Sequence, residues 1–128
     1  MALIPNNEDD ELKTTLPIDY NIIILENIRN TIKLEPEIYF QMARMPHLAN
    51  IYYSHVQDLW LLTKRYAPKT EQQRIDKILE KIYNLTRINT NRDVSEIIYQ
   101  NTRYVFDRIL DVLYRKGKLE KNVFNIRG

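Results

Sequence analysis

The sequence has no cysteine and only two glycines, Gly117 and Gly128, and both shortages exclude whole classes of site. Without cysteine there is no disulfide framework, no thiolate metal site and no cysteine nucleophile, which is typical of a reducing compartment. Without glycine-rich segments the chain cannot form a Walker loop or a dinucleotide-binding turn, and the Asn-Gly and Asp-Gly pairs of tight hairpins are missing. The sequence therefore predicts neither a nucleotide-binding enzyme nor a fold built from hairpins.

Long apolar runs are also missing. A run such as Ile22–Leu25 is far shorter than the stretch of about 20 residues that a membrane helix needs. The first residues, MALIPNNEDDELK, lack a basic segment followed by an apolar one, so we expect no secretory signal. These observations favour an intracellular protein, cytoplasmic or, in a eukaryote, nuclear, with no membrane contact.

The composition that remains is that of a globular protein. Apolar residues make up 44% and charged residues 28% of a chain of 128 residues, enough to bury one core. Apolar residues recur every three or four positions and do not alternate, which predicts an all-α, single-domain bundle of four to five helices. We expect a flexible acidic leader at 1–16, the helical bundle domain at 17–117 and a short basic tail at 118–128.

Five helices follow from this periodicity. They are expected at 19–33, 36–45, 47–66, 70–88 and 91–116. Pro36 is expected to open the second helix, since its missing N–H costs nothing at a first helical position, and Pro46 is expected to end it. The last helix is apolar on two stripes, so we place it at the centre of the bundle.

Three helix ends carry recognisable capping patterns. Thr70 with Gln73 three residues later predicts a capping box at the start of the fourth helix. Thr90 followed by Asp93 predicts a cap and an acidic first turn for the fifth helix. Gly117 is expected directly after the last helix, in the left-handed conformation that ends many helices.

Residues suited to catalysis or metal binding are sparse. His47 and His55 are about 12 Å apart on one helix and cannot share an ion, although Asp58 stands three residues after His55. Asp76 and Glu80, flanked by Lys77 and Lys81, indicate a solvated helix face. The pair Asp107 and Asp111 has the same spacing, but no Glu-x-x-His motif of a di-metal bundle accompanies either pair. Ser54 and Ser95 lack a nucleophile elbow. We therefore expect no enzyme, no cofactor and no metal, and a helical-bundle metalloenzyme is the least favoured alternative.

The chain contains nine tyrosines, an excess for its length. In the third helix the apolar stripe runs through Leu48, Tyr52, Val56, Leu59 and Leu62, which predicts core. Tyr53, Trp60 and Arg65 fall off that stripe, and we predict that they present a second, aromatic surface to a protein partner. The tyrosines also suit two other roles: they can complete the edge of a modest core, or stack on bases beside arginines.

Charge is unevenly distributed although the formal net charge is only +2. From Arg103 onward there are seven basic residues against three acidic ones. This end can favour a phosphate backbone, or it can be a solvated helix face followed by a soluble tail. The candidate nucleic-acid contacts are Arg103, Arg115, Lys116, Lys118 and Lys121.

The order of features resembles the helical domain of the GINS family, subunits of the replicative helicase assembly. An amphipathic helix ends in IKLEPEIYFQMARMP, a tyrosine-led helix follows in MPHLANIYYSHVQDL, and an arginine-containing junction stands in IYNLTRINTNRDVSEII. The residues that match the family's two signatures are Pro46, Tyr52 and Tyr53, then Arg87, Arg92 and Ile97. The proline-to-tyrosine spacing is longer than in the family, its Arg-x-x-Lys-Ile core is not intact, and its small β-domain has no room here.

The resemblance implies a non-catalytic scaffold that works through helix surfaces in a hetero-oligomeric complex. We therefore expect a protein-interaction subunit of a DNA replication assembly. The alternative, drawn from the charge distribution, is a small helical nucleic-acid-binding accessory protein, viral or cellular, that uses the basic C-terminal quarter.

Overall fold

The computed structural model describes residues 20–117, and every element in them is helical. The elements are α2 (Tyr20–Gln41), α3 (His47–Thr63), the 3-10 helix η1 (Lys64–Tyr66), α4 (Lys69–Thr86) and α5 (Arg92–Arg115). The predicted all-α bundle is confirmed, and residues 20–117 contain no strand. The leader predicted at 1–16 and the tail predicted at 118–128 lie outside the described residues.

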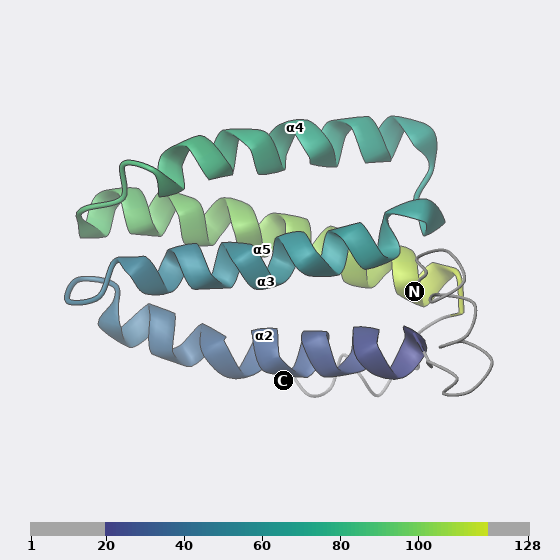
Figure 1. Cartoon of the computed structure of the whole chain (residues 1–128), viewed down its shortest axis with the longest axis horizontal. Coiled ribbons are helices and arrows are strands. Elements are labelled where there is room, and N and C mark those ends of the chain that lie inside the picture. Colours follow the sequence, from purple (N-terminus) through teal and green to yellow (C-terminus); the bar gives the residue numbers. More distant parts are fainter. Residues whose placement is uncertain (1–19, 118–128) are drawn as a thin grey trace, which may run out of the picture.

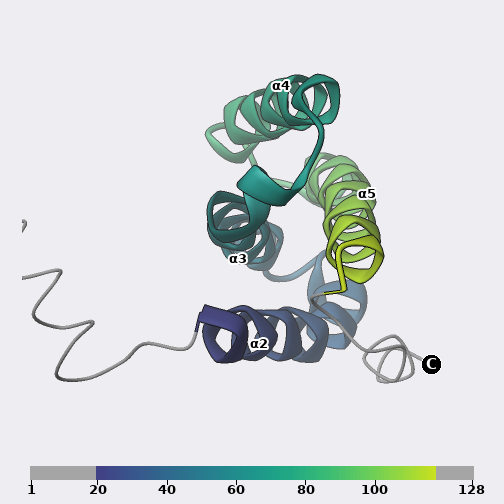
Figure 2. The ribbon, with the colours of Figure 1, turned by 90° about the vertical axis from the view of Figure 1, so that its right-hand side faces the viewer.

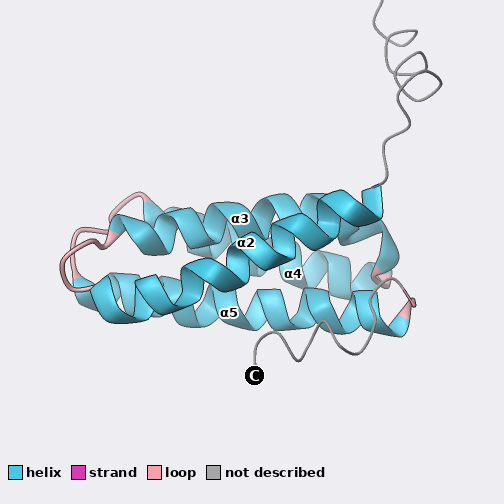
Figure 3. Ribbon diagram, turned by 90° about the horizontal axis from the view of Figure 1, so that it is seen from below, coloured by secondary structure: helices cyan, strands magenta, loops and turns pink. Residues whose placement is uncertain are grey.

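The four α-helices run up and down in turn, each antiparallel to the next along the chain (Figure 1). Viewed along the bundle, α3 and α5 lie side by side, with α4 on one side of this pair and α2 on the other (Figure 2). α2 crosses the pair diagonally, beginning beneath α3 and ending beneath α5 (Figure 3). Short connections are typical of such antiparallel neighbours.

The core lies between α3 and α5 and is closed by α2 and α4. Its largest fully buried side chains include Trp60, Tyr52 and Phe106. α5 buries residues on both of its predicted apolar stripes, including Val105 and Phe106, which fits the central position expected for it.

The prediction that Pro36 opens a separate helix is wrong. α2 continues through Pro36 to Gln41, so the helices expected at 19–33 and 36–45 are one helix. An internal proline removes one backbone hydrogen bond and strains the preceding turn at a cost of about 3 kcal/mol. Continuing the helix buries Ile38 and Met42 and lets Tyr52 bind Glu35, and these contacts offset that cost.

Two of the predicted N-caps are also wrong. α4 begins at Lys69 behind Pro68, whose extended backbone ends the preceding turn, so Thr70 already lies inside the helix. The side chain that binds back is that of Gln72, which donates to the carbonyl oxygen of Ala67 at 2.9 Å. For α5 the cap is Asn91 and not Thr90, because the Asn91 Oδ1 accepts from the Val94 N–H at 3.0 Å.

The predicted C-terminal end of α5 is confirmed. Gly117 has a φ of 72°, the left-handed region that a glycine adopts without strain. Its N–H donates to the Tyr114 carbonyl at 3.0 Å, which satisfies one of the carbonyl groups left open at the helix end.

Polar side chains join the two interhelical connections at one end of the bundle. The Asn89 Nδ2 donates to the Pro46 carbonyl at 2.7 Å and to the Asn50 Oδ1 at 3.0 Å. Ser95, which is fully buried, donates to the Asn89 Oδ1 at 2.9 Å. Because each of these buried or partly buried groups has a partner, this network fixes how the α2–α3 and α4–α5 connections meet.

Candidate functional site

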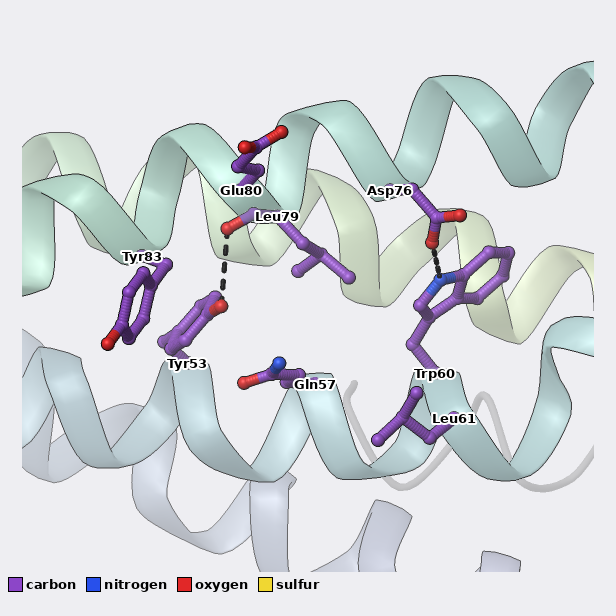
Figure 4. Close-up of a pocket in the computed structure, with 8 residues that line it drawn as sticks. All are labelled: Tyr53, Gln57, Trp60, Leu61, Asp76, Leu79, Glu80 and Tyr83. Atoms are coloured by element: carbon purple, nitrogen blue, oxygen red, sulfur yellow. Dashed lines mark hydrogen bonds between the residues drawn. The ribbon is translucent and has the colours of Figure 1, made fainter.

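A groove lies between α3 and α4. We call it the α3–α4 groove, and it has a volume of about 330 Å³. Its lining residues come from both helices (Figure 4): Tyr53, Gln57, Trp60, Leu61, Asp76, Leu79, Glu80 and Tyr83.

Helical spacing explains why these residues meet. On α3 they stand at positions 53, 57, 60 and 61, and on α4 at 76, 79, 80 and 83. Residues three or four apart occupy one side of a helix, so each helix turns one polar and aromatic edge toward the other. The two edges face each other because α3 and α4 are antiparallel neighbours.

Two aromatic side chains of α3 form the floor of the groove. Tyr53 is 4% exposed and its hydroxyl donates to the Leu79 carbonyl at 3.2 Å. Trp60 is 2% exposed and its Nε1 donates to the Asp76 Oδ1 at 2.8 Å. Each ring therefore packs as core while its polar atom binds α4, as a buried tyrosine or tryptophan requires.

Asp76 lies between the buried Trp60 and the solvent-exposed edge of the groove. Its second carboxylate oxygen accepts from the Lys64 Nζ at 2.7 Å, so one side chain binds both Trp60 and Lys64. Burial raises the pKa of this carboxyl group, but the hydrogen bonds from Lys64 and Trp60 outweigh that effect and the pKa is lowered. Asp76 and Glu80 are both exposed, as expected for a solvated face, but Asp76 also has two partners, Trp60 of α3 and Lys64 of η1, that its neighbours in sequence do not reveal.

Two exposed apolar side chains stand at the edges of the groove. Leu61, on α3, is 66% exposed, and Tyr83, on α4, is 51% exposed. The Tyr83 ring lies 6.5 Å from that of Tyr53, so it extends the aromatic floor outward to the surface. Of the remaining lining side chains, Gln57 and Glu80 are polar, and Leu79 is apolar and buried.

The interface residues predicted from the sequence occupy different places. Tyr53 and Trp60 do lie off the main stripe of α3, but they are buried against α4 and form no exposed aromatic surface. Arg65 is exposed in η1, where its guanidinium lies 4.8 Å from the centre of the Tyr66 ring, and it does not line the groove. The exposed apolar side chains at this site are Leu61 and Tyr83. In the sequence, each is recognisable only as an apolar residue among the polar positions of its helix.

Two of the predicted nucleic-acid contacts, Arg103 and Arg115, form ion pairs within the bundle. The Arg103 guanidinium lies 3.7 Å from the Glu35 carboxylate and 3.3 Å from that of Asp107. Arg115 lies 3.1 Å from the Asp111 carboxylate and 3.9 Å from that of Glu71. Lys116 is exposed.

The other two candidates, Lys118 and Lys121, lie outside the described residues.

Glu71 is the centre of the ion pairs on the α4–α5 side. It is 8% exposed and accepts from the Arg108 Nε at 2.8 Å and from the Arg74 Nη2 at 3.2 Å. The hydrogen bond from Arg108 is the largest influence on its carboxyl group and, although burial opposes it, the pKa is lowered. Part of the basic excess of the C-terminal quarter is thus neutralised by α4.

Catalytic and metal-binding candidates do not converge. Asp107 and Asp111 both pair with arginines of their own helix. Among residues 20–117 no three His, Asp or Glu side chains are grouped so that they could hold a metal ion. None of the helices over the same range combines the length and apolar composition that crossing a membrane requires.

The residues that carry the GINS resemblance are spread over the bundle. The Pro46 carbonyl accepts hydrogen bonds in the connection network, and Tyr52 is fully buried. Arg87 and Arg92 flank the α4–α5 connection and are exposed. No protein-family model, curated protein or solved structure matches the chain. The similarity to GINS subunits therefore stays a prediction from the sequence.

Proposed function

We propose that this chain is a non-catalytic protein-interaction subunit and that its α3–α4 groove receives the partner. The observation that carries the proposal is the pairing of a buried aromatic floor, Tyr53 and Trp60, with two exposed apolar edges, Leu61 and Tyr83. A well-packed apolar centre bordered by polar side chains is the usual anatomy of a protein interface.

Membership of a DNA replication assembly is the finer part of the proposal. It is supported by the order of the helices and by the residues at Pro46, Tyr52–Tyr53 and Arg87–Arg92 that are similar to the GINS signatures. A scaffold of that kind binds through helix surfaces, and the α3–α4 groove is such a surface.

The nucleic-acid alternative has less support. Phosphates would have to compete with Glu35 and Asp107 for Arg103, and with Asp111 for Arg115. Charge reversal at Lys116 and Lys118 leaves those ion pairs intact and is therefore the cleaner test. If the basic end binds duplex DNA, each lost phosphate contact should reduce the log–log salt slope of the affinity by about 0.9. We expect the wild type to show no salt-sensitive DNA binding, so the charge reversal should have no effect.

The test of the main proposal uses two matched variants. Leu61→Asp places a charge at the edge of the groove, whereas Phe40→Asp places one at a residue of α2 that is 82% exposed and does not line the groove. Both tagged variants and the wild type are expressed in the source cells, and co-purifying proteins are quantified by mass spectrometry. We expect Leu61→Asp, but not Phe40→Asp, to lose a defined partner that the wild type retains.

A melting curve for each variant serves as the folding control. If both variants retain the same partners as the wild type, the groove is not the interaction site and the proposed function fails.

A further inference from the structure

The backbone around the α3–α4 groove restricts what form a partner can take. Both walls are α-helices, whose interior N–H and C=O groups already bond within the helix, and residues 20–117 offer no strand edge. An extended peptide would leave its own backbone groups unpaired against these walls. A helix satisfies its backbone internally, so it is the form that an apolar groove between two helices accepts best.

The length of the groove sets the length of the occupant. The lining residues run from Tyr53 to Leu61 on α3 and from Asp76 to Tyr83 on α4. At a rise of about 1.5 Å per residue each wall extends for roughly 10–12 Å, or about two helical turns. Leu61 and Tyr83 stand toward opposite ends of the groove, on opposite walls (Figure 4). A helix lying along the groove would therefore contact both.

The charges of the groove determine the polar edge of the occupant. The only charged side chains in its lining are two carboxylates, those of Asp76 and Glu80. Asp76 is already bound by Trp60 and Lys64. Glu80 is exposed on the α4 wall and has no ion pair with any residue between 20 and 117. An incoming cation can pair with Glu80, whereas an incoming carboxylate would be repelled by it.

From these three observations we infer that the occupant is an amphipathic helix of two to three turns from another protein, with its apolar side between Leu61 and Tyr83 and a lysine or arginine beside Glu80. The inference rests on the proposed function and specifies the chemistry of the partner. A second copy of this chain and an acidic helix are the competing occupants.

Trp60 is a built-in reporter for this site. It is the single tryptophan of the chain, and its indole N–H points at Asp76 in the floor of the groove. A ligand that packs on the floor should shift this one indole resonance in a ¹H–¹⁵N spectrum of the full chain. A ligand that binds elsewhere should leave it in place.

The experiment selects helical peptides from a displayed library. Cross-linked helices of about 11 residues, or three turns, are randomised at one apolar stripe and at the flanking edge positions. The full-length wild type is the bait, and Leu61→Asp is the counter-bait. We expect selected peptides to carry Lys or Arg at an edge position. Exchanging that residue for Glu should weaken binding about threefold to tenfold at low salt, which is the range of an exposed charge pair turned into a repulsive one. The difference should shrink as salt screens it.

Charge reversal on the protein completes the test. Glu80→Lys should invert the preference so that peptides with an acidic edge bind more tightly, and Trp60 should report both interactions. Glu26→Lys, an exposed carboxylate of α2 that does not line the groove, is the matched control and should change nothing.

Three results would overturn the inference. The first is a set of selected peptides with no basic preference, or with one that Glu80→Lys does not change, although they shift Trp60. The groove would then still be an interaction site, and only the partner chemistry would be wrong. The second is the failure of every selected peptide to move the Trp60 resonance. The third is a Trp60 shift that depends on protein concentration alone and disappears in Leu61→Asp, which would identify a second copy as the occupant.

Discussion

Tyr52 and Tyr53 are neighbours in the chain but belong to two very different sides of α3. Successive residues of a helix point about 100° apart, so one ring faces α2 and α5 while the other faces α4. Tyr52 is fully buried, and its ring packs 5.4 Å from Tyr99 and edge-on to Phe106. Tyr53 is also buried, but it packs against Tyr83, which is half exposed.

The polar contacts of the two hydroxyl groups differ in the same way. Tyr52 donates to the Glu35 carboxylate at 2.8 Å, and burial followed by the charge of Glu35 raises the pKa of Tyr52, so this hydroxyl remains a donor. Tyr53 donates to a backbone carbonyl of α4. The Tyr52 side is closed by two helices, whereas the Tyr53 side opens into the groove that we propose as the binding site.

The largest expected effect comes from the closed side. Tyr52→Ala leaves a cavity that solvent cannot reach, because the Tyr52 ring is fully buried, and it removes the hydroxyl group that binds Glu35. We expect a loss of about 3–5 kcal/mol in the free energy of unfolding, measured by urea denaturation. Tyr53→Ala should cost less, because water can enter the space from the groove. Equal losses at the two positions would show that the two sides do not differ in this way.

Two isoleucines of α5 extend this test along the closed side. Ile98 and Ile109 are 0% and 1% exposed, as expected for apolar residues of a central helix. Replacing either with alanine leaves a cavity and should cost about 2–5 kcal/mol, measured by the same denaturation. Near-neutral effects at both positions would mean that these side chains do not belong to the core.

The sequence predicts the closed side well and the open side poorly. Apolar residues at helical spacing identify Tyr52, Val56 and Leu59 as core, because burial on one stripe repeats along the helix. The same pattern says nothing about which neighbour an off-stripe residue meets. The off-stripe position of Trp60 therefore predicts an exposed side chain. In the structure its indole N–H donates to Asp76, 16 residues further along the chain.

Long-range pairing also explains the other differences between sequence and structure. Arg103 looks available in the sequence, but Glu35 lies beside it only because α2 crosses α5. Pro36 predicts a helix start from local rules, and tertiary contacts of Glu35, Ile38 and Met42 override them. Where no tertiary contact competes, the local pattern predicts correctly, as at Gly117, which ends α5 in the left-handed conformation.

Removing the hydroxyl groups alone gives a smaller and sharper comparison. Tyr52→Phe deletes a hydrogen bond to a charged carboxylate and should cost about 1.5–3 kcal/mol. Tyr53→Phe deletes a hydrogen bond to a neutral carbonyl and should cost about 0.5–1.5 kcal/mol. Both are measured by urea denaturation with the ring packing unchanged. A larger loss at Tyr53 would contradict the difference between the two sides.

Acid should weaken the α4–α5 contact through Glu71. The pKa of Glu71 is lowered in the folded protein, so the unfolded chain binds a proton first as the pH falls. The stabilisation is complete above the unfolded pKa of about 4.3 and is lost as the pH falls through the lower, folded value. We expect melting temperatures recorded from pH 6 to pH 2 to fall less steeply for Glu71→Gln than for the wild type. Parallel curves would contradict this role.

The smallest effect on stability is expected at the edge of the groove, where the proposed function predicts the largest effect on binding. Leu61 and Tyr83 are 66% and 51% exposed, so Leu61→Ala and Tyr83→Ala remove little buried surface. Surface substitutions of this kind usually change stability by no more than about 0.5 kcal/mol. The same side chains border the apolar floor, and an interface depends on such anchors. We therefore expect urea denaturation to be nearly unchanged in both variants while the affinity for a groove-binding peptide, followed through the Trp60 resonance, falls several-fold. If stability falls with affinity, Leu61 and Tyr83 belong to the core and the two sides of α3 are alike.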